Sequence, residues 1–329
     1  MIKDKQVIVQ EAGMDWAQSN KTDKAWEALC VTPTGRIIAG CSNDIGIWYS
    51  DDNGVNWVQS NKTSGYWHVL CITSTGRIIA GCSSNGVWYS DDSGETWVQS
   101  NKIDGTWCSL CVTPTGRIIA GCSSNGIWYS DDYGETWTQS NKTNDNFKAL
   151  CVTPTGRIIA AAKSIWYSDD NGETWTRSYN VSIDWSSLCV APTGRIIGCA
   201  YNQSVGIYYS DDNGINWVKS NKTDGTWYSL YVTSAGRIIA GSTSKGIWYS
   251  DDNGLNWVQS NKTDKAWEAL CVTPTGRIIA GNGNGLGIWY SDPVTGTQKA
   301  YASKPLTGKQ ARELVQQCKA YVQSLKNGN

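Results

Sequence analysis

The chain has 329 residues and a formal net charge of −1, with 19 Trp, 16 Tyr and 34 Gly against a single Phe and a single His. A charge this close to zero gives no electrostatic attraction to nucleic acid or to an anionic membrane surface. No apolar run approaches the length of a membrane-spanning helix, so we expect neither nucleic acid nor membrane as a partner.

The N-terminal residues 1–12 predict a short extension ahead of the first structured element. They are polar, and their apolar stretch is too short for a signal peptide, so we expect a cytoplasmic or virion-associated protein in a reducing compartment. The twelve Cys are then expected to be reduced. Most of them recur at two positions of a repeat, as in Cys30 and Cys41, where a small apolar thiol fills a strand interior.

A unit of about forty residues then repeats along most of the chain. Its first copy contains four short apolar runs, 26–31, 37–41, 46–50 and 56–60, each bounded by Gly, Pro, Asn or Asp, which predicts a four-stranded antiparallel sheet. The aromatic that opens the first run occurs seven times, at spacings of 38 to 42 residues: Trp26, Trp67, Trp107, Phe147, Trp185, Trp227 and Trp267. The sequence therefore predicts an all-β, seven-bladed β-propeller.

The two ends of the repeat region predict how the ring closes. The seventh copy stops near 291–293 without a fourth strand, and residues 14–20 match the strand that is missing. We therefore expect the propeller to occupy 13–296, with the N-terminal strand 14–20 completing the last blade.

An acidic turn with the pattern Ser-x-Asp-x-Gly-x-Thr/Asn-Trp ends the third run in six copies. This pattern resembles the Asp-box (BNR) repeat of sialidase-like propellers. We expect its second Asp to accept backbone N–H groups across the turn, its Gly to supply a positive φ and its Trp to pack the hairpin. The expected structural carboxylates are Asp52, Asp92, Asp132, Asp170, Asp212 and Asp252. Each turn offers two carboxylates, which is too few for Ca²⁺, so no metal and no cofactor is expected.

The resemblance to sialidases also implies a catalytic apparatus, namely three clustered Arg, a Tyr–Glu pair and an Asp acid. Here seven Arg occupy one repeated turn position and cannot converge on a single carboxylate: Arg36, Arg77, Arg117, Arg157, Arg195, Arg237 and Arg277. Nothing in the sequence places a pair of carboxylates uniquely in a cleft. We therefore expect that the chain is not an enzyme. A degenerate glycoside hydrolase is the last of three functional alternatives, after the two given below.

Two side-chain pairs across the first hairpin stay open at this point. If Thr113 pairs with Arg117, then Cys108 lies opposite Cys122 and could form a disulfide. The same register places His68 opposite Cys82, which is half a zinc site at best.

Variation among the copies predicts which face of the propeller binds a ligand. The turns that contain the repeated Arg and the Asp box hardly change, whereas the loops before the first run and between the second and third runs differ between copies. Because strands alternate in direction, the two variable loops share one end of the ring, and recognition is expected there. The expected ligand-binding residues are Trp26, Trp67, Trp107, Trp185, Trp227, Trp267, Asn20, Asn61, Asn141, Asn221 and Asn261.

The C-terminal residues 297–329 predict a linker followed by an amphipathic helix over 307–326. Its apolar stripe either docks on the propeller or forms a homo-oligomer. The preferred functional hypothesis is a lectin-like module that binds a glycan or protein through the variable face. The main alternative is an interaction protein such as a phage virion or tail component.

Overall fold

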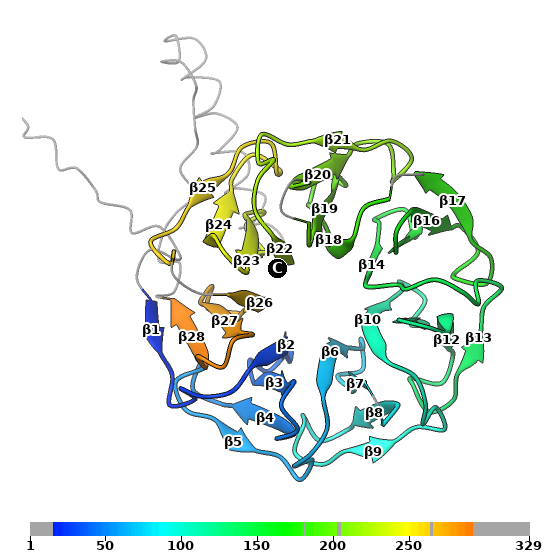
Figure 1. Cartoon of the computed structure of the whole chain (residues 1–329). Coiled ribbons are helices and arrows are strands. Elements are labelled where there is room, and N and C mark those ends of the chain that lie inside the picture. Colours follow the sequence, from blue (N-terminus) through cyan, green and yellow to red (C-terminus); the bar gives the residue numbers. More distant parts are fainter. Residues whose placement is uncertain (1–15, 84, 180–181, 203–204, 264–265, 292–329) are drawn as a thin grey trace, which may run out of the picture. The chain divides into compact units, whose positions relative to one another are not determined.

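The computed structural model describes residues 16–83, 85–179, 182–202, 205–263 and 266–291. These residues form seven sheets of four strands each, arranged as blades around a centre (Figure 1). Every strand pairing within a blade is antiparallel, which confirms the predicted seven-bladed propeller. The described residues contain no helix of the length and apolar character needed to cross a membrane.

Each blade runs from an inner strand to an outer one, and consecutive strands pair. The innermost strands are β2 (Trp26–Val31), β6 (Trp67–Ile72), β10 (Trp107–Val112), β14 (Ala149–Val152), β18 (Trp185–Val190), β22 (Trp227–Val232) and β26 (Trp267–Val272). The second strands are β3 (Ile37–Cys41), β7 (Ile78–Cys82), β11 (Ile118–Cys122), β15 (Ile158–Ala161), β19 (Ile196–Ala200), β23 (Ile238–Ser242) and β27 (Ile278–Asn282). The third strands are β4 (Ile47–Ser50), β8 (Val87–Ser90), β12 (Gly126–Ser130), β16 (Ile165–Ser168), β20 (Ile207–Ser210), β24 (Gly246–Ser250) and β28 (Ile288–Ser291). The outer strands are β5 (Val58–Gln59), β9 (Val98–Gln99), β13 (Thr138–Gln139), β17 (Thr176–Tyr179), β21 (Val218–Lys219), β25 (Val258–Gln259) and β1 (Trp16–Gln18).

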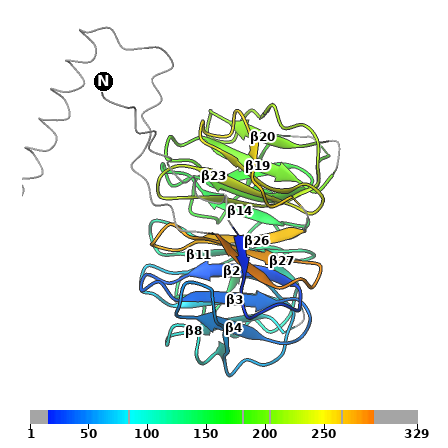
Figure 2. The ribbon, with the colours of Figure 1, turned by 90° about the vertical axis from the view of Figure 1, so that its left-hand side faces the viewer.

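The ring is closed by the first described strand. β1 pairs with β28, so that Trp16 lies opposite Ser291, and the Ser19 N–H donates to the Ile288 carbonyl at 3.0 Å. Figure 2 shows the last blade, with β26 and β27, beside β2 of the first. The predicted closure is confirmed. The predicted extension 1–12, the boundaries at 13 and 296, and the helix 307–326 lie outside the described residues.

The Asp boxes hold the hairpin between the third and outer strands. In blade 2, one oxygen of Asp92 accepts the Ser90 hydroxyl at 2.9 Å and the Thr96 N–H at 2.8 Å, while the other accepts the Thr96 hydroxyl. Gly94 has φ 89° and Trp97 donates its indole N–H to the Gly94 carbonyl. In blade 2 the Asp thus accepts hydrogen bonds across the turn, the Gly has a positive φ and the Trp is bonded to the hairpin. The residue before the Gly, Ser93 in this blade, also has a positive φ.

The repeated Arg side chains connect the blades on the face that carries the invariant turns, which we call the constant face. Arg36 makes a bidentate pair with Asp51 in its own blade, at 2.6 and 3.0 Å, and reaches Glu95 in the next blade at 2.9 Å. It also stacks on Tyr49, with its guanidinium carbon 4.3 Å from the ring centroid. These bonds confirm that the two invariant turns share one end of the blades.

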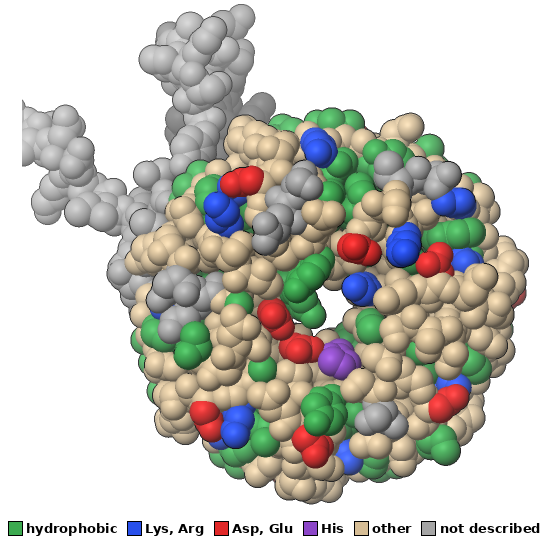
Figure 3. Space-filling view, in the orientation of Figure 1, with side chains coloured by type: hydrophobic (Ala, Val, Ile, Leu, Met, Phe, Trp, Pro, Cys, Tyr) green, Lys and Arg blue, Asp and Glu red, His purple; other side chains and the backbone are tan. Residues whose placement is uncertain are grey.

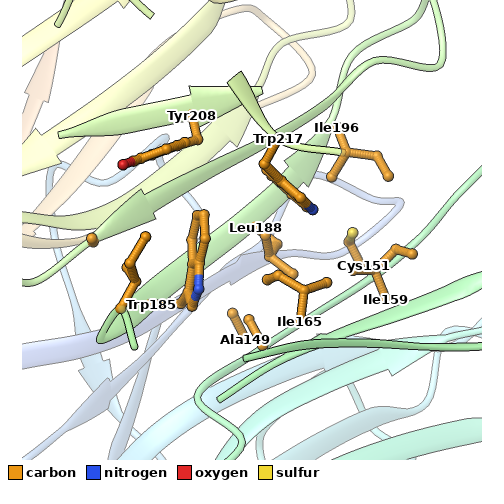
Figure 4. Close-up of a cluster of buried hydrophobic side chains, with 12 residues drawn as sticks. Ala149, Cys151, Ile159, Ile165, Trp185, Leu188, Ile196, Tyr208 and Trp217 are labelled. Atoms are coloured by element: carbon orange, nitrogen blue, oxygen red, sulfur yellow. The ribbon is translucent and has the colours of Figure 1, made fainter. Parts of the chain in front are cut away.

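The core lies mainly between neighbouring blades. Trp67 of blade 2 packs with Ile38 and Ile47 of blade 1 and with Trp97 of its own blade. Figure 4 shows the same arrangement around Trp185, between blades 4 and 5. This packing explains a Gly inside the second strand, because a Cβ on Gly40 would lie 2.7 Å from the Cβ of Trp67.

Candidate functional site at the centre of the ring

Six of the seven innermost strands have a β-bulge directly after their first aromatic residue. In β6, Trp67 pairs with Cys82 and Val69 with Gly81, so that His68 has no partner in the ladder. The same register shift occurs in β2, β10, β18, β22 and β26. A bulge bends the strand and redirects the side chain of the extra residue.

The bulge corrects the predicted hairpin register by one residue. Trp107, not Cys108, lies opposite Cys122, and Trp67, not His68, lies opposite Cys82. Cys108 and Cys122 are both free thiols. No group of three or more His, Cys, Asp or Glu in the described part of the chain is placed to hold a metal ion.

The bulge residues of the ring line one central cavity of about 800 Å³, which opens in the middle of the face shown in Figure 3. In the fourth blade the corresponding residue directly precedes β14. We call these seven residues the mouth ring: Glu27, His68, Cys108, Lys148, Ser186, Tyr228 and Glu268. A second ring of seven Leu also lines the cavity: Leu29, Leu70, Leu110, Leu150, Leu188, Leu230 and Leu270.

The cavity mouth lies on the face with the variable loops. The Ser42 N–H, in the loop after β3, donates to the carbonyl of Ala25, which precedes β2, so the two variable loops meet. Gly283, in the equivalent loop of the last blade, packs against the carboxyl group of Glu268, and any larger residue would displace that group. The predicted opposition of a constant face and a variable face is therefore present in the structure.

Three of the mouth-ring residues, in blades 7, 1 and 2, form an acidic group in which Glu27 and His68 are bonded to each other. Nδ1 of His68 lies 2.5 Å from Oε2 of Glu27, and both side chains are partly buried, with exposed fractions of 27% and 19%. Burial, and then the charge of Glu27, raise the pKa of Glu268 to about 7, while His68 acts in the opposite direction. Glu268 can therefore take up or release a proton near neutral pH, as a general acid or base must.

The remaining mouth-ring residues differ in chemistry from this acidic side. Lys148 is exposed and makes no ion pair within the described residues. Burial raises the pKa of the Cys108 thiol to about 11, so this thiol is protonated at neutral pH and is a poor nucleophile. Tyr228 packs edge-on against Tyr201, with ring centroids 5.9 Å apart, and Tyr201 is 51% exposed.

The predicted ligand-binding Trp side chains lie elsewhere. The six indoles are 0–1% exposed and fill the interior between the blades. In this conformation they present no face to a ligand, because the bulge directs the next residue, not the Trp, to the cavity. The alternative role, packing between neighbouring blades, is the one the structure shows for Trp26, Trp67, Trp107, Trp185, Trp227 and Trp267.

The predicted Asn residues lie near the outer strands, away from the cavity. Asn20 accepts the Trp57 N–H at 3.1 Å, and the Asn61 N–H donates to the Glu95 carbonyl of the next blade. The backbone N–H groups of Asn141 and Asn221 make the corresponding bonds to the next Asp box, and Asn261 follows the outer strand β25. Four of the five therefore have a structural role in joining adjacent blades.

The mouth ring was missed in the sequence, although a signal for it was present. The position after the first aromatic holds six residue types in seven copies, while the Leu two residues later never changes. The meaning of this variation depends on a bulge that the repeat pattern does not reveal.

A second cavity of about 490 Å³ lies on the constant face. It is lined by Arg36, Asp51, Asp92 and Glu95, among others. These residues belong to invariant turns, and Arg36 is already paired with both Asp51 and Glu95. Structural roles account for its charged groups, so the central cavity is the better candidate site.

Together, the fold and the acidic turns define the chain as a seven-bladed β-propeller with BNR/Asp-box repeats. The BNR/Asp-box repeat family matches residues 166–177 and 208–219, the acidic turns of blades 4 and 5. No curated protein sequence matches the chain.

Several solved structures share this fold. A catalytically inactive virginiamycin B lyase from Staphylococcus aureus with quinupristin aligns at TM-score 0.70 and 11% identity, over 84% of this chain and 98% of that one. YCF48 bound to D1 peptide aligns at TM-score 0.67 and 14% identity, over 86% of this chain and 95% of that one. The computationally designed protein Ika8 aligns at TM-score 0.57 and 12% identity, over 83% of this chain and 98% of that one. These identities show a shared fold alone.

The expectation that the chain is not an enzyme is corrected by these comparisons. Virginiamycin B lyase is an enzyme with the same fold, so the architecture gives no ground for excluding catalysis. The premise that no pair of carboxylates lies in a cleft is also wrong. The ring brings Glu27 and Glu268 into one cavity, although 241 residues separate them along the chain.

Proposed function

We propose that the chain is a ligand-binding propeller that holds its ligand in the central cavity, at the mouth ring. The observation that carries this proposal is the contrast within the repeat. The strands are similar from blade to blade, yet the mouth-ring position holds six residue types in seven copies, more than any other position of the innermost strands. A position that served only for packing would repeat, as the Leu ring does.

The size of the cavity supports a ligand of small-molecule dimensions. Binding pockets for small molecules typically measure about 300–1,000 Å³, and this cavity is within that range. Two of the similar structures carry quinupristin and the D1 peptide, which supports binding by analogy of fold alone. A compact ligand, or a few residues of a peptide, fits this volume.

A carbohydrate is a ligand class with specific support. Tyr201 and Tyr228 form an aromatic pair beside the mouth ring, and the exposed ring of Tyr201 offers an apolar face on which a sugar can stack. Glu27, Glu268 and Lys148 supply acceptors and donors for hydroxyl groups nearby. The lectin hypothesis therefore moves from the buried Trp residues to this pair.

The test is a ligand search with matched variants. A glycan array and a mixed library of small molecules and peptides are screened against the wild-type protein, and each hit is measured again with His68→Ala and Lys148→Ala. Val98→Ser, on an exposed position of outer strand β9, is the control. We expect at least a tenfold loss of affinity in one mouth-ring variant and no change in the control.

The proposal also predicts where a hit leaves its footprint. Ligand-induced shifts in an NMR spectrum should involve Tyr201 and Tyr228 and not the tyrosines of the constant face, such as Tyr49. Hits that bind equally well to both mouth-ring variants, or a library without any hit, would contradict a binding site in the central cavity.

A further inference from the structure

The charged groups of the mouth ring are separated across the opening. Glu27 and Glu268 stand in the first and seventh blades, which are neighbours in the closed ring, as Figure 2 shows for β2 and β26. Lys148 belongs to the fourth blade, three blades away from each of them. A seven-membered ring places the fourth blade opposite the junction of the first and seventh. In Figure 3, acidic side chains lie at one side of the central opening and a basic side chain lies across from them, with another acidic side chain farther out beyond it.

The acidic side carries negative charge that the protein neutralises only in part. Oε2 of Glu27 is bonded to His68, whereas Glu268 makes no hydrogen bond or ion pair within the described residues. Its carboxyl group is instead partly buried against Gly283 and close enough to Glu27 for the two charges to repel. Partly buried carboxylates without a counter-ion are costly, so a cationic group between these two would be stabilised.

The basic side of the opening carries a positive charge, that of Lys148, which the described residues do not pair with an anion. Lys222, also on the variable face, is by contrast occupied, because it pairs with Asp224 at 2.6 Å and lies over Trp248. Lys148 lacks such a partner in the described part of the chain, and the neighbouring mouth-ring positions, Cys108 and Ser186, are uncharged. The ammonium group of Lys148 is therefore free to meet an anionic group.

On the basis of the binding site proposed above, we propose that the ligand is dipolar. A protonated amine or guanidinium lies between Glu27 and Glu268, and a carboxylate or similar anion meets Lys148 on the opposite side. The part between the two charges lies over the apolar Leu ring. Zwitterions with a short apolar spacer, such as ω-amino acids or short peptides, have this distribution of charge.

The experiment uses a series of ω-amino acids from β-alanine to aminooctanoate, with the alkylamine and the alkanoate of matched length for each. Affinities are measured by calorimetry on the full chain. We expect one spacer length to bind best, at least tenfold more tightly than its matched amine or acid. The length at the optimum measures the span between the two charged sides.

Three variants assign the two ends of the probe. The double variant Glu27→Gln/Glu268→Gln should bind the zwitterion with no higher affinity than the matched acid. Lys148→Met should bind it with no higher affinity than the matched amine. Val98→Ser, at an exposed position of outer strand β9 and outside the mouth ring, is the control and should leave the affinities of the series unchanged. Thermal unfolding of each variant separates loss of binding from loss of folding.

The outcomes distinguish this inference from the proposed function. If no zwitterion binds, but a neutral ligand such as a glycan binds and is lost in His68→Ala, the dipolar ligand is wrong and the central site remains. A zwitterion that binds equally well to Lys148→Met also overturns the inference. If no compound of any class binds at the mouth ring, both proposals fail.

Discussion

The indole of Trp16 stacks on that of Trp267, with ring centroids 6.1 Å apart and an angle of 29° between the planes. One residue belongs to the first described strand of the chain and the other to the innermost strand of the last blade. This contact, together with the pairing of β1 and β28, closes the ring across 251 residues of sequence. Closure therefore depends on a strand only three residues long.

Trp16→Ala should destabilise the whole propeller, not only its first strand. Removal of a large aromatic from a partly buried position costs about 2 kcal/mol, less than the 3–5 kcal/mol typical of a fully buried one. Urea unfolding, followed by Trp fluorescence and by circular dichroism, measures this loss. Ala17→Ser, at an exposed position of the same strand, is the control. Equal stability of Trp16→Ala and the control would show that the ring stays closed without this contact.

Asp92→Ala should lower the stability by about 1–2 kcal/mol, because it removes a charged acceptor of three hydrogen bonds in the Asp box of blade 2. Thr138→Ala, at an exposed position of β13, is the control. The effect should depend on pH. Burial acts to raise the pKa of Asp92, but hydrogen bonds from Thr96 and Ser90 outweigh it and hold the pKa below its ordinary value of 3.8.

Because the folded-state pKa is depressed, the contribution of Asp92 is complete above about pH 5 and is lost as the pH falls through the folded pKa. The difference in unfolding free energy between wild type and Asp92→Ala should therefore shrink below pH 4. A difference that stays constant down to pH 2 would contradict the role of the ionised carboxylate.

Gly81→Ala should destabilise the protein by overpacking. The added methyl group would lie 2.7 Å from Cγ1 of Val69 and 2.8 Å from the Cβ of Trp107 in the next blade. Such an overlap typically costs about 1–3 kcal/mol. Blade 4 has Ala161 at the equivalent position, so Ala161→Gly is the matched comparison and should not relieve any clash. Calorimetric unfolding of both variants tests the difference, and a neutral Gly81→Ala would be the contrary result.

Glu268→Gln should stabilise the protein at pH 8 and leave its stability unchanged near pH 4. The pKa of Glu268 is raised to about 7 from an ordinary 4.5, so ionising it disfavours the folded state as the pH rises through this window. One pKa unit corresponds to about 1.4 kcal/mol, and solvent screening of this partly exposed group reduces the total to about 1–2 kcal/mol.

Urea unfolding at the two pH values measures the gain. Glu173→Gln provides the control, because that exposed carboxylate pairs with Arg117 on the constant face and should, if anything, lose stability at pH 8. A gain of equal size at pH 4 and pH 8 would argue against a raised pKa of Glu268.

The architecture could be predicted in detail because each repeat carries its own local signals. Turns, Asp boxes and aromatic spacing specify one blade, and seven copies then specify a ring, including the strand at 16–18 that completes it. The site could not be predicted in the same way. The sequence pattern suggests that Trp67 faces a ligand, whereas the bulge at His68 buries Trp67 and turns His68 toward the cavity.

A second reason why the site could not be predicted is that its residues lie far apart in the sequence. Glu27, His68 and Glu268 are chemically ordinary when read along the chain, and only closure of the ring brings them together. The variation at this repeat position was visible, but no local rule links variation at one strand position to the axis of a propeller.

The β-bulge of the innermost strands has a consequence for how such a protein can change over generations. In six blades the mouth-ring residue lies outside the register of the two innermost strands, so its side chain can be replaced without a change in their pairing. Each blade contributes one such residue, and the seven positions already hold six residue types while every blade keeps its four-stranded order. The same ring can therefore be kept while the side chains that line its central cavity are substituted one at a time.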